Sequence, residues 1–161
     1  MPRYLGLIDA VRRKRTTQRV RQSGWHDPFP EVHGTLPEKM VYAELSRLGI
    51  PFYFLNDLNI TIPDLDFQQY FQADFYIPGA NLIIEVQGSF WHSKEKTIEA
   101  DAYKFALYET VGYRAVAWWD FDIYMRLHDL IIGEPALFAL ARPKDGIKLS
   151  SEITPMRRTK V

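Results

Sequence analysis

The middle of the chain alternates hydrophobic and polar residues in a way that predicts two strands joined by a tight turn. Residues 71–77 and 82–87 are strand-like, and Pro78-Gly79-Ala80-Asn81 between them is a turn sequence. A turn centred between Gly79 and Ala80 gives one wholly apolar face that suits a core, with the pairs Ala73–Val86, Phe75–Ile84 and Ile77–Leu82. The other face then carries the pairs Gln72–Gln87, Asp74–Glu85 and Tyr76–Ile83.

Helical patterns lie on both sides of this hairpin. Thr35, Pro37 and Glu38 form a capping sequence ahead of an apolar stripe, and Gly49 ends that helix. A second helix is predicted from about residue 93 to 111, closed by Gly112, with inward positions at Ile98, Ala102, Phe105 and Ala106.

Two further stretches complete the sheet. Residues 52–62 indicate one or two strands, interrupted at Asn56-Asp57, and residues 113–119 indicate another strand. Because strand, helix and strand follow one another, 82–87 and 113–119 should be parallel neighbours. The predicted fold class is therefore α/β: a mixed sheet, made of an antiparallel hairpin plus a parallel crossover strand, flanked by helices.

Charge divides the chain of 161 residues into three parts, although the net charge is zero. Residues 1–30 hold seven basic and two acidic residues, residues 142–161 hold six and two, and the stretch between them carries −9. We expect a basic N-terminal arm and loop (1–34), a core domain (35–141) and a basic C-terminal tail (142–161). Such arms suit a polyanionic partner, and solvated tails explain them about equally well.

Composition excludes several classes of protein. No apolar run approaches the ~18 residues of a membrane span, and the N-terminus lacks the apolar core of a secretory signal. The chain contains no cysteine, which excludes disulfides, thiolate zinc sites and cysteine catalysis. A cytoplasmic location without membrane contact fits these features.

The facing acids Asp74 and Glu85 predict a metal site. Two acidic residues directly opposed on one sheet face have Cβ atoms ~5 Å apart, so their carboxylates repel each other unless one is protonated or a cation lies between them. Mg²⁺ prefers oxygen ligands and is often held by one or two carboxylates plus a substrate phosphate. A solvent-facing sheet on which the two acids never meet is the simpler alternative.

A family resemblance runs through the same residues. Asp74 followed by Glu85-Val86-Gln87 resembles the D…(D/E)xK signature of the restriction-endonuclease-like, or PD-(D/E)xK, nuclease superfamily, with Gln87 in place of the lysine. ADFYIP, then IIEVQGSFWH, and then D-x-x-K…G-Y-x-x-V at 101–116, are similar to very short patch repair endonucleases. The likeness covers roughly residues 35–123; the cysteines of the repair enzymes' zinc site are missing.

The resemblance implies a role for each matching residue. Asp74, Glu85 and the backbone carbonyl of Val86 would bind Mg²⁺ or Mn²⁺, and Gln87 would position the attacking water or a phosphate. His92 would be the general base, although a histidine that caps the following helix is an equal alternative. Glu38 would assist metal binding, and Lys104 would supply the missing lysine charge; a capping box and an ion pair with Asp101 explain them nearly as well.

The implied partner is DNA, in duplex form. Phe90 and Trp91 would wedge between bases, or lie buried under the following helix. Phosphate contacts are expected from the basic residues Arg12, Arg13, Lys14, Arg15, Arg19 and Arg21.

The leading hypothesis is a Mg²⁺-dependent endonuclease of restriction, repair, recombination or mobile-element processing. Double-strand cleavage would need a homodimer or two successive cuts. A non-catalytic DNA-binding or assembly subunit on the same fold is the alternative, and an RNA substrate ranks low.

Overall fold

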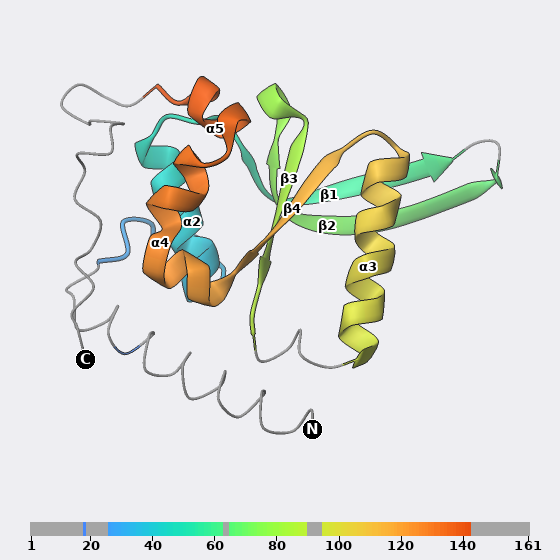
Figure 1. Ribbon diagram of the computed structural model, residues 1–161, viewed down its shortest axis with the longest axis horizontal. Helices are drawn as coiled ribbons and strands as arrows, with labels where there is room; N and C mark the ends of the chain where they lie inside the picture. Colours follow the sequence, from blue (N-terminus) through green and yellow to red (C-terminus); the bar gives the residue numbers. More distant parts are fainter. Residues whose placement is uncertain (1–17, 19–25, 63–64, 90–94, 143–161) are drawn as a thin grey trace.

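A computed structural model describes residue 18 and residues 26–62, 65–89 and 95–142. These residues form four strands and four α-helices, with a short 3₁₀ turn in one hairpin (Figure 1). In chain order the elements are α2 (Leu36–Arg47), β1 (Tyr53–Ile62), β2 (Phe67–Ile77), η2 (Pro78–Ala80), β3 (Leu82–Gln87), α3 (Glu95–Thr110), β4 (Arg114–Trp119), α4 (Asp120–Ile132) and α5 (Pro135–Leu140).

The strands form one sheet in the order β1-β2-β3-β4. The pairs β1–β2 and β2–β3 are antiparallel, whereas β3 and β4 are parallel and are joined by the crossover through α3. The predicted α/β class and mixed sheet are therefore confirmed.

Helices cover the sheet in two separate groups (Figure 1). Helices α2, α4 and α5 bury one apolar cluster with Phe75, Ile77, Leu82 and Ile84. Helix α3 buries a second, smaller cluster against the other side of the sheet, with Leu107 and Tyr108 facing Leu58, Ile60 and Ile83. Since β3 contributes to both clusters, nearly all of its side chains are buried.

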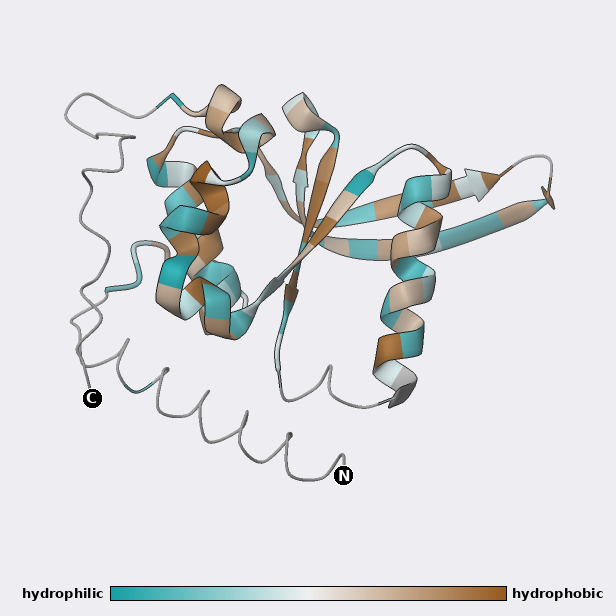
Figure 2. Cartoon of the chain, viewed as in Figure 1, coloured by the Kyte–Doolittle hydropathy of each residue, from teal (hydrophilic) through white to brown (hydrophobic). Residues whose placement is uncertain are grey.

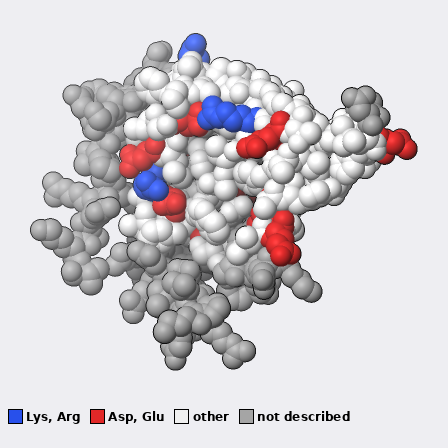
Figure 3. Space-filling view, turned by 45° about the vertical axis from the view of Figure 1, so that its right-hand side comes forward, with Lys and Arg blue, Asp and Glu red and all other residues white. Residues whose placement is uncertain are grey.

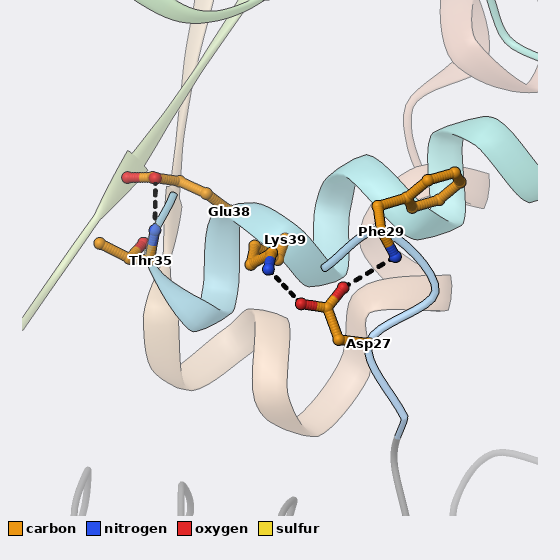
Figure 4. A network of polar contacts seen from close by, with 5 residues as sticks. All are labelled: Asp27, Phe29, Thr35, Glu38 and Lys39. Carbon is orange, nitrogen blue, oxygen red and sulfur yellow. Dashed lines mark hydrogen bonds and ion pairs between the residues drawn. The ribbon is translucent and has the colours of Figure 1, made fainter. Parts of the chain in front are cut away.

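The loop before α2 is tied to that helix (Figure 4). Asp27 accepts hydrogen bonds from the Lys39 ammonium and, at 2.9 Å, from the backbone N–H of Phe29. The Lys39 contact is the main cause that lowers the pKa of Asp27. At the start of α2, Glu38 Oε2 accepts from the backbone N–H of Thr35 at 2.8 Å, so the predicted helix start is confirmed.

The hairpin register is as predicted for the three pairs next to the turn, whereas the predicted pairs Asp74–Glu85, Ala73–Val86 and Gln72–Gln87 are not part of the β2–β3 ladder. Phe75 pairs with Ile84, Tyr76 with Ile83, and Ile77 with Leu82. Asn81 takes the left-handed conformation at φ 47° that the tight turn requires, and its side chain donates to the Gly112 carbonyl at 2.7 Å.

Two details of the predicted elements are wrong. Strand β1 runs through Asn56 and Asp57 without a break, and its irregularity lies instead at Leu55, which has φ 49°. In α3, Ile98, Ala102 and Ala106 are exposed, and the inward residues include Lys104, Leu107 and Tyr108. The prediction followed the apolar residues of the helix, whereas the inward stripe of α3 carries polar groups toward the sheet.

The predicted single apolar face is also divided. Ala73 belongs to the cluster under α3, although Phe75, two residues later, belongs to the cluster under α2 and α4. The change of side falls at Asp74, opposite the left-handed Leu55 of β1, and it shows that the backbone does not simply alternate through this point.

Hydropathy follows the same layers, with apolar residues concentrated where the helices meet the sheet (Figure 2). Within the described ranges, the helices are all too short or too polar to cross a bilayer.

Candidate active site

Strands β2 and β3 diverge at the two predicted metal-binding acids. Their ladder ends at the pair Phe75–Ile84, one step before Asp74 and Glu85, while β3 stays paired with β4 as far as Gln87. In the opening between the strands, Asp74 Oδ2 accepts a hydrogen bond from the backbone N–H of Val86 at 2.7 Å. The Asp74 carboxylate thus replaces a backbone carbonyl as the partner of β3.

The position of Asp74 makes its charge costly. Burial raises its pKa first, and the negative charge of Glu85 raises it further. The hydrogen bond from Val86 and the charge of Lys104 only partly oppose these effects, so the pKa reaches about 7. A carboxyl group that is half protonated at neutral pH lies where a cation would be stabilising.

Glu85 is held by two residues of α3. Its Oε1 accepts from the Tyr108 hydroxyl at 2.8 Å and lies 2.9 Å from the Lys104 ammonium. Lys104 also donates to the backbone carbonyl of Gln72 at 3.1 Å, which ties α3 to β2 beside Asp74. Burial of Tyr108 and its contact with Glu85 raise the pKa of the phenol, so it stays a donor.

Glu38 reaches the same region from the start of α2. It caps the helix through Thr35, and its charge is also one of the causes that raise the pKa of Asp74. Glu38 therefore both caps α2 and lies near enough to Asp74 for its charge to act on that carboxyl. Three elements (α2, the β2–β3 fork and α3) meet at one group of ionisable side chains.

Gln87 lies two residues beyond Glu85 and shares its side of β3, with 7% of its surface exposed. Near the end of the same strand, the Ser89 hydroxyl donates to Asp120, which is 2% exposed and also accepts the N–H of Phe121 at the start of α4. This second buried acid was not anticipated from the sequence.

Backbone strain marks the same place. Leu55 has φ 49°, a left-handed conformation that is unfavourable for a leucine, and the β1–β2 register places it opposite Asp74. Such strain persists where surrounding structure imposes it, and it is concentrated at functional sites.

The donor set suits a hard divalent cation. The contacts described above use Oδ2 of Asp74 and Oε1 of Glu85, which leaves Oδ1 and Oε2 as the oxygens that can face an ion. In an extended strand the N–H and C=O of one residue point the same way, so the Val86 carbonyl lies on the edge that faces Asp74. Among the described residues, no three His, Cys, Asp or Glu side chains are grouped to hold a metal, so a cation here would need backbone oxygen, water or phosphate as well.

Several predicted site residues cannot be placed. His92, Phe90 and Trp91 lie outside the described residues, as do all the predicted phosphate contacts from Arg12 to Arg21. Asp74, Glu85, Lys104 and Glu38 do come together.

Sequence reasoning missed Tyr108 as a member of this group. Its spacing from Lys104, four residues earlier on the same helix, was the available signal, because residues i and i+4 share a helix face.

Comparison with known proteins adds little. No family model matches the sequence, and neither does any curated protein. Among solved structures, the chain is similar to the catalytic domain of the homing endonuclease I-Bth0305I, with 23% identity, 62% of this chain and 97% of that domain covered, and a TM-score of 0.42.

Proposed function

We propose that this protein is a metal-dependent DNA endonuclease that hydrolyses phosphodiester bonds. The observation that carries the proposal is the fork between β2 and β3, where Asp74 and Glu85 meet, partly buried, beside a lysine and a helix-capping glutamate. The resemblance of Asp74…Glu85-x-Gln87 to the PD-(D/E)xK signature, and of the flanking segments to very short patch repair endonucleases, supports the same assignment.

In this proposal, Asp74, Glu85 and the Val86 carbonyl would hold Mg²⁺ or Mn²⁺. A bound ion would lower the pKa of a water molecule and offset charge on the phosphate. Tyr108 and Lys104 keep Glu85 in place through Oε1, and Glu38 adds negative charge beside Asp74. Gln87 orients the attacking water or a phosphate oxygen, and His92 accepts a proton from that water.

DNA would be held mainly by the basic arms. Acidic side chains are scattered over the face of the described part that Figure 3 shows, and the basic ones form no continuous patch there. Residues 1–30 carry a net charge of +5, so they are the natural source of phosphate contacts. Phe90 and Trp91, which follow β3 closely in sequence, are proposed to contact the bases.

One observation favours the non-catalytic alternative. Lys104 already places an ammonium 2.9 Å from Glu85 Oε1, so part of the negative charge is balanced without a metal. A nuclease-like subunit that binds DNA without cutting it would keep such an ion pair, and Gln87, unlike a lysine, can neither take up a proton nor carry positive charge.

Plasmid cleavage tests the proposal. Full-length protein with Mg²⁺ or Mn²⁺ should convert supercoiled plasmid to nicked or linear DNA, and EDTA should stop the reaction. Asp74→Asn and Glu85→Gln should each lower the rate at least about 100-fold, because each removes a charged metal ligand. Glu109→Gln removes an exposed acid of α3 away from the fork and should leave the rate unchanged.

Cleavage that persists in Asp74→Asn would refute the assignment. Calorimetry decides the alternative: a non-catalytic subunit would bind DNA equally well with and without either acid, and would show no Mg²⁺ or Mn²⁺ binding that depends on both.

A further inference from the structure

Strands β1 and β2 continue past the site as a two-stranded ribbon, seen at the right of Figure 1. Its pairing is regular from Asp57–Gln72 to Ile62–Phe67. The ribbon lies outside the reaction centre, and nothing in the proposed function uses it.

The two faces of the ribbon differ. One face carries Leu58, Ile60 and Phe71, which pack in the cluster beneath α3. The other face, called here the amide face, consists of three exposed cross-strand pairs, Asp57–Gln72, Asn59–Tyr70 and Thr61–Gln68. Among these residues is Tyr70, whose side chain is 68% exposed, although an aromatic ring in a sheet would normally be covered.

Side chains of the amide face hydrogen-bond one another. Gln68 Nε2 donates to Asn59 Oδ1 at 3.1 Å and to the Tyr70 hydroxyl at 2.9 Å, and Gln72 Nε2 donates to Asp57 Oδ1 at 3.3 Å. These bonds are solvent-exposed, so a ligand that offers matching donors and acceptors can replace them at little cost. They also fix the orientation of the Gln68 and Gln72 amides in the free protein.

We propose that the amide face reads base edges in the major groove of duplex DNA; this rests on the proposed function. The major groove admits a two-stranded β-ribbon, and Asn or Gln pairs with adenine through N6 and N7. Asp57 can accept from the cytosine amino group, and Thr61 and Tyr70 can contact thymine methyl groups. From Thr61 to Asp57 the face is about 13 Å long, the length of about four base pairs.

The absence of basic residues from the ribbon indicates that it contributes to the sequence specificity of DNA binding rather than to the overall affinity. The sequence has no lysine or arginine between Arg47 and Lys94, so the ribbon offers nothing to attract phosphates. Amides without basic neighbours gain energy only from matched base edges, whereas the basic arms would bind any sequence.

The amide face ends next to the fork along β2. Gln72 is its last residue, two residues before Asp74, and the Gln72 backbone carbonyl accepts the Lys104 ammonium that also contacts Glu85. The ribbon therefore adjoins the fork through the backbone of β2.

The experiment selects sequences from a library of duplexes with a randomised 20-base-pair stretch. Selection uses full-length Asp74→Asn protein in EDTA, so that binding is measured without cleavage. This protein should enrich a preference of up to about four adjacent base pairs. Adding Gln68→Ala or Asn59→Ala should reduce discrimination at one of these positions by about 5- to 150-fold. Gln69→Ala is the matched control, since it removes the same side chain from the opposite face of the ribbon and should keep the preference.

Replacing preferred adenines by 7-deazaadenine, which lacks the N7 acceptor, should have the same effect as Gln68→Ala or Asn59→Ala. The inference is refuted if the protein shows no base preference or no DNA binding, or if Gln68→Ala and Asn59→Ala both keep the preference. It survives if the ribbon variants lose the preference while the parent protein fails to cleave with Mg²⁺, a result that refutes only the endonuclease activity.

Discussion

At the scale of single residues, this protein concentrates its electrostatic cost on Asp74. The carboxyl is desolvated, faces Glu85, and is close enough to Glu38 and Lys104 for their charges to act on it. One hydrogen bond, from the Val86 N–H, favours the charged form. The balance raises the pKa of Asp74 to about 7, so a cation beside it would favour the charged form.

Metal-free protein should become less stable as the pH rises from about 4 to 7. The pKa of Asp74 is 3.8 when unfolded and about 7 when folded, so the unfolded state ionises first as the pH rises. Asp74→Asn still accepts the Val86 N–H and cannot ionise, so it should be more stable than the parent at pH 8 by up to about 4 kcal/mol. Urea unfolding in EDTA at pH 4.5 and 8 measures this; a constant difference at both pH values would contradict it, and Asp57→Asn is the control.

Tyr108 should act through Glu85. Tyr108→Phe removes the 2.8 Å hydrogen bond to Oε1 and leaves Lys104 as the partner of that oxygen. Loss of such an orienting contact typically costs about 10- to 100-fold in metal affinity or activity. Mg²⁺ titration by calorimetry measures the loss. The control is Tyr103→Phe, which alters an exposed tyrosine of the same helix and should leave the Mg²⁺ affinity unchanged. If Tyr108→Phe lowers stability but leaves Mg²⁺ affinity intact, the hydroxyl is merely structural.

At the scale of elements, the site depends on where β2 and β3 separate and on where α2 begins and ends. Strand β3 stays in the sheet through β4, while β2 leaves it at Asp74 and continues with β1 as the ribbon. Helix α2 brings Glu38 to the fork because its capping sequence fixes where it starts. Its far end is fixed by Gly49, which has φ 65° and lies against the backbone of Arg142.

Gly49→Ala should therefore destabilise the fold. A Cβ at Gly49 would lie 2.4 Å from the Arg142 carbonyl oxygen, in addition to the strain of φ 65°. We expect a loss of about 2–4 kcal/mol, of which the left-handed conformation accounts for about 1–2 kcal/mol. Gly112→Ala has φ 90° with open space around its Cβ, so it isolates the conformational part and should cost less in urea unfolding. Equal losses would show that the contact with Arg142 is unimportant.

At the scale of the whole molecule, opposite charges are separated along the chain. The stretch from 31 to 141 carries −9, and the two ends carry the compensating positive charge. An acidic core repels a polyanion, so under the proposed function the basic ends would have to supply the attraction for DNA.

Neutralising Arg12, Arg13, Lys14 and Arg15 to Gln together should weaken binding to every DNA sequence alike. If all four side chains contact phosphate, the slope of log Kd against log salt should fall by about 3.6. Fluorescence anisotropy across a salt series measures the slope, and Arg126→Gln, whose side chain pairs with Asp122, is the control. An unchanged slope would mean that these four side chains make no phosphate contacts and serve only as a solvated, charged segment.

The amino-acid sequence by itself determined which segments form strands, the turn, and the register of the three pairs beside it, because these depend on local periodicity and turn residues. It also singled out Asp74, Glu85, Glu38 and Lys104, through their spacing and their resemblance to a known signature. Only the tertiary structure decided that β2 and β3 part at Asp74, that α3 turns Lys104 and Tyr108 inward while Ile98 is exposed, and that Ala73 and Phe75 lie in different clusters. These features follow from how the helices and the twisted sheet share one interior, and no pattern confined to a single segment contains that information.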